Sequence, residues 1–190
     1  MKSRRNQFYI FKGLIVFISK LYAILPNFIL QFLWDLSRPY SQLPFILLRY
    51  VILKSRISSC GDNIRIGTNV TIKGWKHLEI GSDVSIHDNC YIDAGGFISL
   101  GNNVSIAHNS TLLSGTHTYE DKNVPIKYNK ITIKDGLKVC DDVWIGCGVR
   151  VLSDLIISKR VIVAAGAVVN KSLDGNSIYA GVPAEKIKEI

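Results

Sequence analysis

The sequence predicts an all-β main domain, a parallel β-helix of six-residue repeats, with an α-helical segment before it and a short C-terminal helix after it. Two observations support this fold class. Apolar residues recur every six positions over most of the chain after residue 60, whereas the first 60 residues show the three- and four-residue spacing of amphipathic helices. A chain of 190 residues is long enough for one packed domain with an appendage, but short for two independent cores.

The N-terminal segment, residues 1–60, predicts three helices. Apolar side chains recur at three- and four-residue steps between residues 7 and 25, and Pro26 ends this pattern. The stretches NFILQFLWDL (27–36) and LPFILLRYVILKS (43–55) predict two further helices separated by a turn. The apolar stripe of the first helix consists of Phe8, Phe11, Ile15, Ile18, Tyr22 and Leu25.

Basic charge is concentrated in the same 60 residues. Nine of the 23 Lys and Arg residues lie there but only one of the 15 acidic residues, so this segment carries the whole formal charge of +8. A basic excess confined to the most apolar part of the chain favours an anionic membrane surface as partner over nucleic acid, whose binding needs no flanking Phe, Ile and Leu. Two compatible interpretations stay open: a helical platform in the membrane interface, or a cap over one end of the main domain.

The segment predicts neither a secretory leader nor a transmembrane helix. Lys12 and Lys20 leave only seven uninterrupted residues between them, and Leu21 does not suit a small-x-small cleavage site. The longest uncharged run, residues 21–34, has fourteen residues, fewer than the roughly 20 that a bilayer core needs. Four cysteines without C-x-x-C spacing predict reduced thiols. We therefore expect a cytoplasmic protein with peripheral contact at the inner face of the cell membrane.

Six-residue repeats make up residues 61–190. Neither a helix nor an alternating strand has this period, but a chain that forms a short strand and then turns a corner every six residues does. Three such hexads close one triangular coil, and Gly, Asn and Asp occupy the corners, where φ > 0 is needed. Two steps before residue 112 are eight residues long, and the others are six, apart from the interruption between Leu112 and Ile133. The inward positions are Ile66, Ile72, Ile80, Ile86, Ile92, Leu100, Ile106, Leu112, Ile133, Val139, Ile145, Val151, Ile157, Val163 and Val169.

The repeat is interrupted once. Thr118 stands where an aliphatic residue is due, and the next aliphatic residue in register is Ile133, so residues 114–131 are expected to leave the β-helix as a projecting loop. A stack of closed coils has no cavity, and long loops in regular domains are usually functional. His117 stands at the base of this loop. Its imidazole suits a general base near neutral pH, and the alternative is a loop histidine that only caps a turn.

From Gly61 to Ile190 the sequence resembles the hexapeptide-repeat acyltransferases, in particular sugar and polysaccharide O-acetyltransferases such as the galactoside and maltose enzymes. The catalytic histidine of these enzymes lies at the root of a projecting loop, eight residues after an Asn or Gly, as His117 follows Asn109. ITIKDGLKVCDDVWIG (131–146) resembles their downstream motif, lengthened by one hexad. The resemblance implies a left-handed β-helix and a homotrimer with active sites between subunits. It also implies acetyl-CoA as acyl donor and no metal.

The resemblance implies roles for residues on the acceptor side of the reaction. The pattern DNCYID matches the family's N-C-x-x-D and places Asn89 in contact with the acceptor sugar, with Asp93 orienting the acceptor or the imidazole. Tyr119, two residues after His117, is a further candidate for substrate binding. The backbone N–H of Cys147, directly after W-I-G, would stabilise the oxyanion. A thiol nucleophile at Cys147 is the competing interpretation, but no histidine lies near it in sequence.

The resemblance also implies coenzyme contacts in the last coils. Trp144 would pack against the coenzyme, Ala165 would offer a backbone contact, and Lys171 would approach a phosphate. Glu185 departs from the pattern, because the family often has Arg there. AGVPA (180–184) marks the exit from the last coil before the expected C-terminal helix.

These features predict an acetyl-CoA-dependent O-acetyltransferase acting on a sugar hydroxyl of a cell-surface polysaccharide or its lipid-linked precursor. An N-acyltransferase on a nucleotide amino sugar, or a serine or antibiotic acetyltransferase, is the alternative on the same fold. A zinc β-helix protein of the carbonic anhydrase type needs three histidines, two of them five residues apart, and His77, His87, His108 and His117 lack that spacing. A purely structural β-helix would leave the loop without a purpose.

Overall fold

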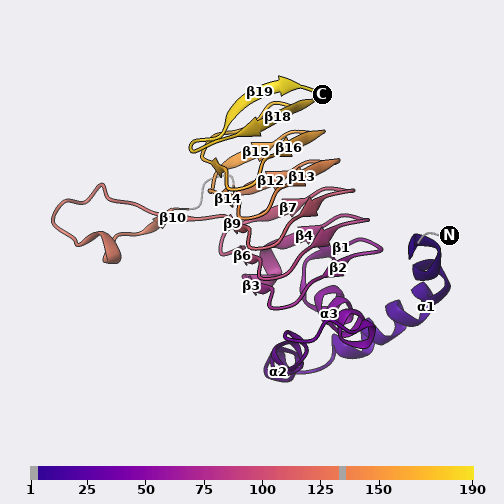
Figure 1. The fold of residues 1–190 in the computed structure, drawn as a ribbon. Helices are drawn as coiled ribbons and strands as arrows, with labels where there is room; N and C mark the ends of the chain where they lie inside the picture. Colours follow the sequence, from indigo (N-terminus) through magenta and orange to yellow (C-terminus); the bar gives the residue numbers. More distant parts are fainter. Residues whose placement is uncertain (1–3, 133–135) are drawn as a thin grey trace.

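The computed structural model describes residues 4–132 and 136–190, with side chains from residue 12 onward. Three helices lie at one end of a stack of short strands, and a narrow arm projects from the side of the stack (Figure 1). The stack is a left-handed parallel β-helix, as predicted.

Three parallel sheets form the sides of the β-helix, and each coil gives one strand to each sheet. The first sheet contains β1 (Ser59–Cys60), β4 (Leu78–Ile80), β7 (Ile98–Leu100), β12 (Leu137–Val139) and β15 (Leu155–Ile157). The second contains β2 (Arg65–Ile66), β5 (Ser85–Ile86), β8 (Ser105–Ile106), β13 (Val143–Ile145), β16 (Val161–Val163) and β18 (Ser177–Ala180). The third contains β3 (Thr71–Lys73), β6 (Tyr91–Asp93), β9 (Thr111–Leu113), β14 (Arg150–Val151) and β17 (Val168–Val169).

Stacked aliphatic side chains fill the interior. In the second sheet, for example, Ile66, Ile86, Ile106, Ile145 and Val163 lie in register one above another, each at most 1% exposed. Burial of such columns is the main favourable term in the stability of this domain. Every predicted inward position is buried except Ile133, which lies outside the described residues.

The first and second corners, which follow the first and second sheets, are tight and repetitive. Short polar residues take the left-handed conformation in column after column, as the sequence predicted. At the first corner these are Asn63, Asp83, Asn103, Asp142 and Asn176, with Arg160 (φ 60°) as the exception. At the second corner they are Asn69, Asn89 and Asn109, continued upward by Gly148 and Gly166.

The third corner, between the third and first sheets, is irregular. Both eight-residue steps fall here, and the first holds a 3₁₀ turn, η1 (Trp75–His77). Gly74, before that turn, has φ +68°, and a Cβ there would lie 2.0 Å from the carbonyl oxygen of Ala94. The projecting arm leaves from the same corner. Its base is an antiparallel pair, β10 (Thr116–His117) with β11 (Ile131–Thr132), and η2 (Ile126–Tyr128) lies farther out.

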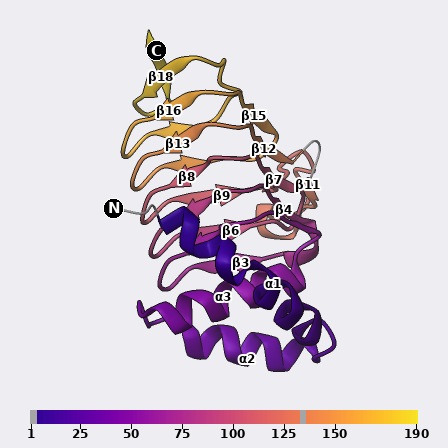
Figure 2. The ribbon, with the colours of Figure 1, turned by 90° about the vertical axis from the view of Figure 1, so that its right-hand side faces the viewer.

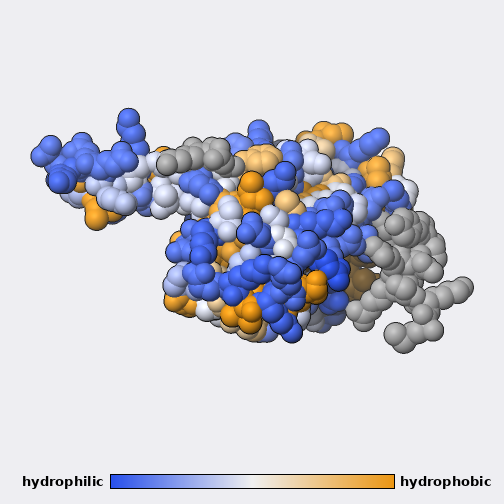
Figure 3. Space-filling model, turned by 90° about the horizontal axis from the view of Figure 1, so that it is seen from above, coloured by the Kyte–Doolittle hydropathy of each residue, from blue (hydrophilic) through white to orange (hydrophobic). Residues whose placement is uncertain are grey.

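The arm stands clear of the body and is largely hydrophilic, with a small hydrophobic patch (Figure 3). Its predicted end at residue 131 is one residue short, because β11 pairs with β10 as far as Thr132. Strand β12 begins at Leu137 and pairs directly with β7, Val139 opposite Leu100. Ile131 and Thr132 stay in the arm because they pair with Thr116 and His117.

The predicted C-terminal helix is also wrong. Residues 185–189 form β19 (Glu185–Glu189), which pairs antiparallel with β18. The free edge of β18 carries backbone N–H and C=O groups that need partners, and a strand that folds back supplies them. Charged residues at four of the five positions of β19 keep the new outer edge polar.

The three predicted helices are confirmed: α1 (Arg4–Tyr22), α2 (Asn27–Ser37) and α3 (Leu43–Arg56). They cover the lower end of the β-helix, and α2 lies across the base (Figure 2). Trp34 of α2 and Ile52 and Leu53 of α3 are at most 1% exposed. Buried Arg49 of α3 links the helices to the first coil of the β-helix. Its guanidinium donates to the carbonyl oxygens of Ile66 (3.2 Å), Tyr40 (2.9 Å) and Ser37.

Candidate active site

His117 lines a shallow pocket of about 390 Å³ at the base of the arm. Strand β10 places it there, through backbone pairing with Ile131. The imidazole is exposed and has no side-chain hydrogen bond among the described residues. It is therefore free to contact an acceptor. The lining residues are Asp93, Gly95, Gly96, Leu113, Gly115, Thr116, His117 and Ile131.

Asp93, for which the resemblance implies a role in orienting the acceptor or the imidazole, lines the same pocket as His117. It ends β6, directly below Leu113 of β9. Its carboxylate accepts hydrogen bonds from the Gly95 N–H (3.1 Å) and the Tyr91 hydroxyl (3.3 Å). No hydrogen bond joins it to His117 among the described residues, so of its two predicted roles the geometry favours contact with the acceptor.

Sequence reasoning missed two pocket residues, Gly95 and Gly96. They widen the third corner in the coil below His117, where the second eight-residue step occurs. That longer step was the available signal, because two extra residues at a corner must protrude from a regular coil. Tyr119 lies beyond the pocket on the arm and is 76% exposed.

Asn89, Cys147 and Ala165 lie on the opposite edge of the third sheet, at the second corner. The strand register stacks Ala165 directly above Cys147, and Asn89 lies two coils below Cys147 with φ 58°. The N–H groups of Cys147 and Ala165 have no acceptor within the described part of the chain. Trp144, on the outer face of β13, is 54% exposed beside this corner. These four residues form one surface with free backbone donors.

The structure adds one observation on the alternative in which the Cys147 thiol is the nucleophile. His108, distant in sequence, lies in the coil directly below, and its carbonyl oxygen accepts the Gly148 N–H at 3.0 Å. No hydrogen bond joins the imidazole of His108 to the thiol among the described residues, so the pair does not activate a nucleophile in this arrangement. His108 and His87 are exposed at corners, as predicted. Burial raises the pKa of Cys60 to about 12 and also raises that of Cys90, which makes both poor nucleophiles.

Lys171 follows β17 and forms an exposed ion pair with Glu185, with both Nζ–Oε distances at 2.8 Å. The residue predicted to contact a phosphate therefore already has an anionic partner. The side chains are 52% and 62% exposed, so this pair is open to exchange with a ligand. No group of three or more His, Cys, Asp or Glu side chains suited to a metal ion occurs in residues 4–132 and 136–190.

No protein-family model matches the chain. Two yeast proteins provisionally named acetyltransferases match short stretches, one from Schizosaccharomyces pombe with 41% identity over 54 residues and one from Saccharomyces cerevisiae with 40% over 50 residues. The matches cover 28% and 26% of this chain and only 26% of the length of each yeast protein.

Solved structures match most of the chain. A maltose O-acetyltransferase from Clostridium difficile 630 superposes with a TM-score of 0.75 and 25% identity, covering 85% of this chain and 84% of that one. This chain has the fold of the hexapeptide-repeat acetyltransferases. A galactoside acetyltransferase in complex with coenzyme A has a TM-score of 0.74 at 22% identity, covering 86% of this chain and 80% of its own. The hexapeptide-repeat acetyltransferase VCA0836 from Vibrio cholerae, in complex with acetyl coenzyme A, has 0.73 at 21%, covering 84% of each chain.

The hexapeptide-repeat chain thus carries two groups of candidate residues on opposite edges of its third sheet. One edge holds His117 and Asp93, and the other holds Asn89, Cys147 and Ala165, with a strand of the sheet between them. The second edge fits an acyl-CoA chemically, because two unpartnered N–H donors and an exposed indole suit an amide-bearing chain. One copy of the chain does not bring the two groups together.

Proposed function

We propose that this protein transfers an acetyl group from acetyl-CoA to a hydroxyl of a sugar in a cell-surface polysaccharide or its lipid-linked precursor. The observation that supports this most is the position of His117, exposed and lining an open pocket at the base of the arm. Solved relatives of the same fold include a maltose O-acetyltransferase and chains bound to coenzyme A.

In this proposal, His117 accepts the proton of the attacking hydroxyl, while Asp93 and Asn89 orient the sugar and Tyr119 contacts it. Acetyl-CoA, when bound, would supply the acetyl group as a thioester: the hydroxyl oxygen would bond to the carbonyl carbon as the C–S bond breaks. Coenzyme A would leave as its thiol, with the proton that His117 returns. The Cys147 N–H donates to the carbonyl oxygen as negative charge develops there. Trp144, Ala165 and Lys171 hold the donor. No metal is needed for these steps. General-base catalysis by the imidazole would contribute about 10²- to 10⁴-fold.

We propose a homotrimer with sites between subunits, and the separation of the two residue groups supports it. A second copy that places its second corner against the arm of the first would complete one site from both. The arm supports such contact, because Tyr119, Ile126, Tyr128 and Ile131 expose between 62% and 76% of their surface. Side chains of this kind are typical of protein interfaces.

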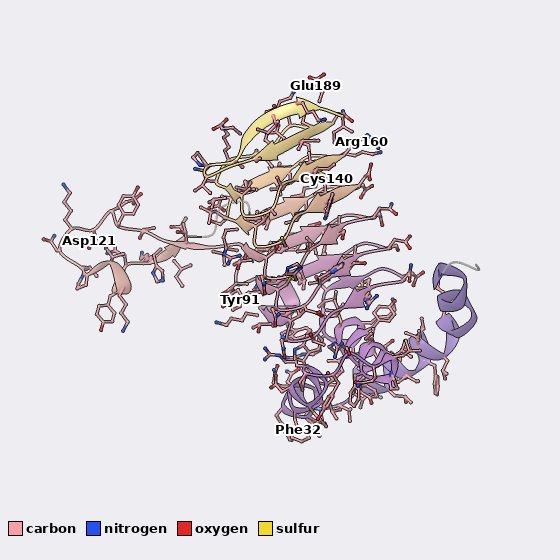
Figure 4. The ribbon with its side chains drawn as sticks, in the orientation of Figure 1. Phe32, Tyr91, Asp121, Cys140, Arg160 and Glu189 are labelled. Atoms are coloured by element: carbon pink, nitrogen blue, oxygen red, sulfur yellow. The ribbon has the colours of Figure 1, made fainter. Side chains whose placement is uncertain are left out.

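We further propose that the helical end contacts an anionic membrane surface at the inner face of the cell membrane. The described part of the predicted stripe of α1, Ile15, Ile18 and Tyr22, packs inward, with Ile15 6% exposed. A second apolar stripe faces outward. Phe32 lies on the lower, outer side of α2 (Figure 4). None of the described helices has both the length and the apolar character to cross a bilayer. The exposed apolar set is Leu14, Phe17, Leu21, Ile24, Phe28, Phe32, Leu36, Tyr40, Leu43 and Leu47.

Charge selects a lipid surface over a second copy as the occupant of this face. Residues 1–60 carry the formal +8, but Arg49 is buried and Lys12 and Lys54 pair with Asp62. The remaining positive charge disfavours contact between two such faces and attracts anionic headgroups. The expected result is flotation with vesicles of phosphatidylglycerol and phosphatidylcholine, but not with phosphatidylcholine alone. The paired change Phe28→Asp and Phe32→Asp should abolish it, and Ile156→Asp, an exposed change on the β-helix, should not. Equal binding to both vesicles would contradict the proposal.

An N-acyltransferase is the second candidate, since the fold also occurs in AntD from Bacillus cereus, with a TM-score of 0.58 at 24% identity. The better superposition on the maltose enzyme favours oxygen acceptors. The deciding experiment incubates the full chain with labelled acetyl-CoA and paired acceptors, glycans and amino sugars, with His117→Ala as control. We expect label on a glycan hydroxyl that depends on His117. Label only on amines, or undiminished transfer by the variant, would overturn the proposal.

A further inference from the structure

A second shallow pocket, of about 350 Å³, lies at the third corner between the helical end and the His117 pocket. It is formed by the start of α2, the end of α3 and the first widened corner. No acidic residue lines it, whereas Arg56, Lys76 and His77 do. The remaining lining residues are Asn27, Gly74 and Trp75.

Arg56 is held rigidly in this pocket. Its guanidinium lies over the ring of Trp75, 4.2 Å from the centroid, and its Nη1 donates to Gln31 Oε1 at 3.0 Å. Trp75 in turn meets buried Trp34 edge to face, at 4.8 Å. The other guanidinium N–H groups have no hydrogen-bond partner in the described part of the chain. A fixed fork with free donors is the geometry that binds phosphate oxygens.

The other two side chains add to this positive surface. Lys76 is exposed and forms no ion pair among the described residues. His77 Nδ1 lies 3.2 Å from the carbonyl oxygen of Gly95, so it donates there and leaves Nε2 toward solvent. Asp35 on α2 accepts hydrogen bonds from Gln31 (3.1 Å) and Arg38 (3.5 Å) and does not line the pocket. Burial lowers the pKa of the Arg56 guanidinium, and the negative charge of Asp35 partly opposes that shift.

The pocket lies between two surfaces that the proposed function uses. Asn27, which lines it, directly precedes Phe28 of the exposed apolar face, and Ile24 is 81% exposed in the turn just before. On the upper side, the contact between His77 and Gly95 joins it to the His117 pocket, because Gly95 lines that pocket. Adjacent coils are about 4.8 Å apart, and the two pockets lie two coils apart, so about 10 Å separates them.

We propose that this pocket binds the phosphate groups of a lipid-linked acceptor, a glycan carried on a membrane lipid through a phosphate or diphosphate. The lipid stays in the bilayer below the helices, Arg56 and Lys76 hold the phosphate oxygens, and the attached sugar extends along the third corner to His117. This inference rests on the proposed function and specifies its substrate class. It explains why two widened corners, and not one, lie beneath the arm.

Two measurements test it, one of them independent of catalysis. Inorganic pyrophosphate binding to the full chain is measured by calorimetry for wild type, Lys76→Gln and Arg56→Lys. The control Lys138→Gln removes the same charge from an exposed site on the first sheet. We expect Lys76→Gln to weaken binding about tenfold, the size of one charge-assisted hydrogen bond, with Lys138→Gln near wild type. The Arg56→Lys variant keeps the positive charge but loses the paired N–H donors of the guanidinium. A melting curve shows whether this variant remains folded.

The second measurement compares three forms of an acceptor glycan: free, with a 1-diphosphate, and with a prenyl diphosphate in vesicles. For wild type and for the control Lys138→Gln, the diphosphate should lower KM about tenfold against the free glycan, and Lys76→Gln should remove that advantage. An advantage that requires the prenyl chain and survives Lys76→Gln would mean that the lipid alone is recognised, and would overturn the phosphate site. Equal KM for all three forms would also overturn it.

Failure of this inference is distinguishable from failure of the proposed function. If no glycan form is acetylated, the proposed function fails whatever pyrophosphate does. If free glycan is acetylated but pyrophosphate does not bind, or binds equally to Lys76→Gln and wild type, only the phosphate site is wrong. Competition by coenzyme A for the pyrophosphate site would assign the pocket to the donor's own phosphates and would likewise overturn the acceptor site.

Discussion

The second corner of this β-helix is regular from coil to coil, whereas the third corner is not. At the second corner each coil repeats the same left-handed turn, from Asn69 to Gly166, and the column continues without insertion. At the third corner the coils differ: one holds a 3₁₀ turn, one is widened by Gly95 and Gly96, and one extends into the arm. Both described pockets lie along this irregular corner. The regular second corner therefore presents backbone N–H donors at a fixed spacing, whereas the irregular third corner presents the two pockets.

The largest expected effect tests whether the irregular corner holds the base. His117→Ala should lower kcat about 10²- to 10⁴-fold, because the hydroxyl loses its proton acceptor. Folding should be unaffected, since the side chain is exposed. The check is steady-state transfer from labelled acetyl-CoA together with a thermal melt.

The matched control for that variant is His108→Ala, an exposed histidine on the regular corner. It should retain wild-type activity. A loss in His108→Ala equal to that in His117→Ala would move the chemistry to the Cys147 column and reverse the comparison between the corners.

The second prediction concerns the need for both corners in one site. His117→Ala removes the base, and Ala165→Trp obstructs the donor surface, so each variant alone should be inactive. If sites form between copies, mixed trimers refolded from equal amounts should regain about a quarter of wild-type activity, because each site draws one chain at random for each edge. No recovery above the single variants would place both groups in one subunit.

Much of this comparison could be predicted from the sequence. The six-residue period identified the coils, because the inward position that recurs every six residues is aliphatic, and the two eight-residue steps marked the widened corners. The extent of the arm and β19 could not be predicted, because both depend on pairing between segments rather than on local period. Thr132 belongs to the arm only because it faces Thr116, and Glu185 is in a strand only because β18 needs a partner. The same limit applies to Arg56, whose pocket partners come from η1.

A third prediction separates the stacked interior from the arm. Ile106→Ala, at a position with 0% exposure, should lower the free energy of unfolding by about 2 to 5 kcal/mol, because it leaves a cavity in a closed column. Ile126→Ala, 65% exposed on the arm, should change it by about 0.5 kcal/mol or less. Denaturant melts with constant m-values measure both. A large loss for Ile126→Ala in a dilute monomer would show that the arm is part of the folded core.

The smallest expected effect concerns the ion pair between Lys171 and Glu185. Both side chains are more than half exposed, so breaking the pair should change stability by less than about 1 kcal/mol. The two variants that break the pair should change the KM for acetyl-CoA in opposite directions. Glu185→Gln removes the competing carboxylate and should lower KM for acetyl-CoA about two- to fivefold if Lys171 meets a phosphate, while Lys171→Gln should raise it by a similar factor.

The form of acetyl-CoA that lacks its 3′-phosphate sharpens this test. If Lys171 contacts that phosphate, both variants should bind the dephosphorylated donor as wild type does, because the group that distinguishes them is gone. If both variants shift KM equally for the two donors, Lys171 acts on the diphosphate or at long range. No shift with either donor would leave the ion pair a surface contact between β19 and the last coil, and the donor's phosphate would then need another cation.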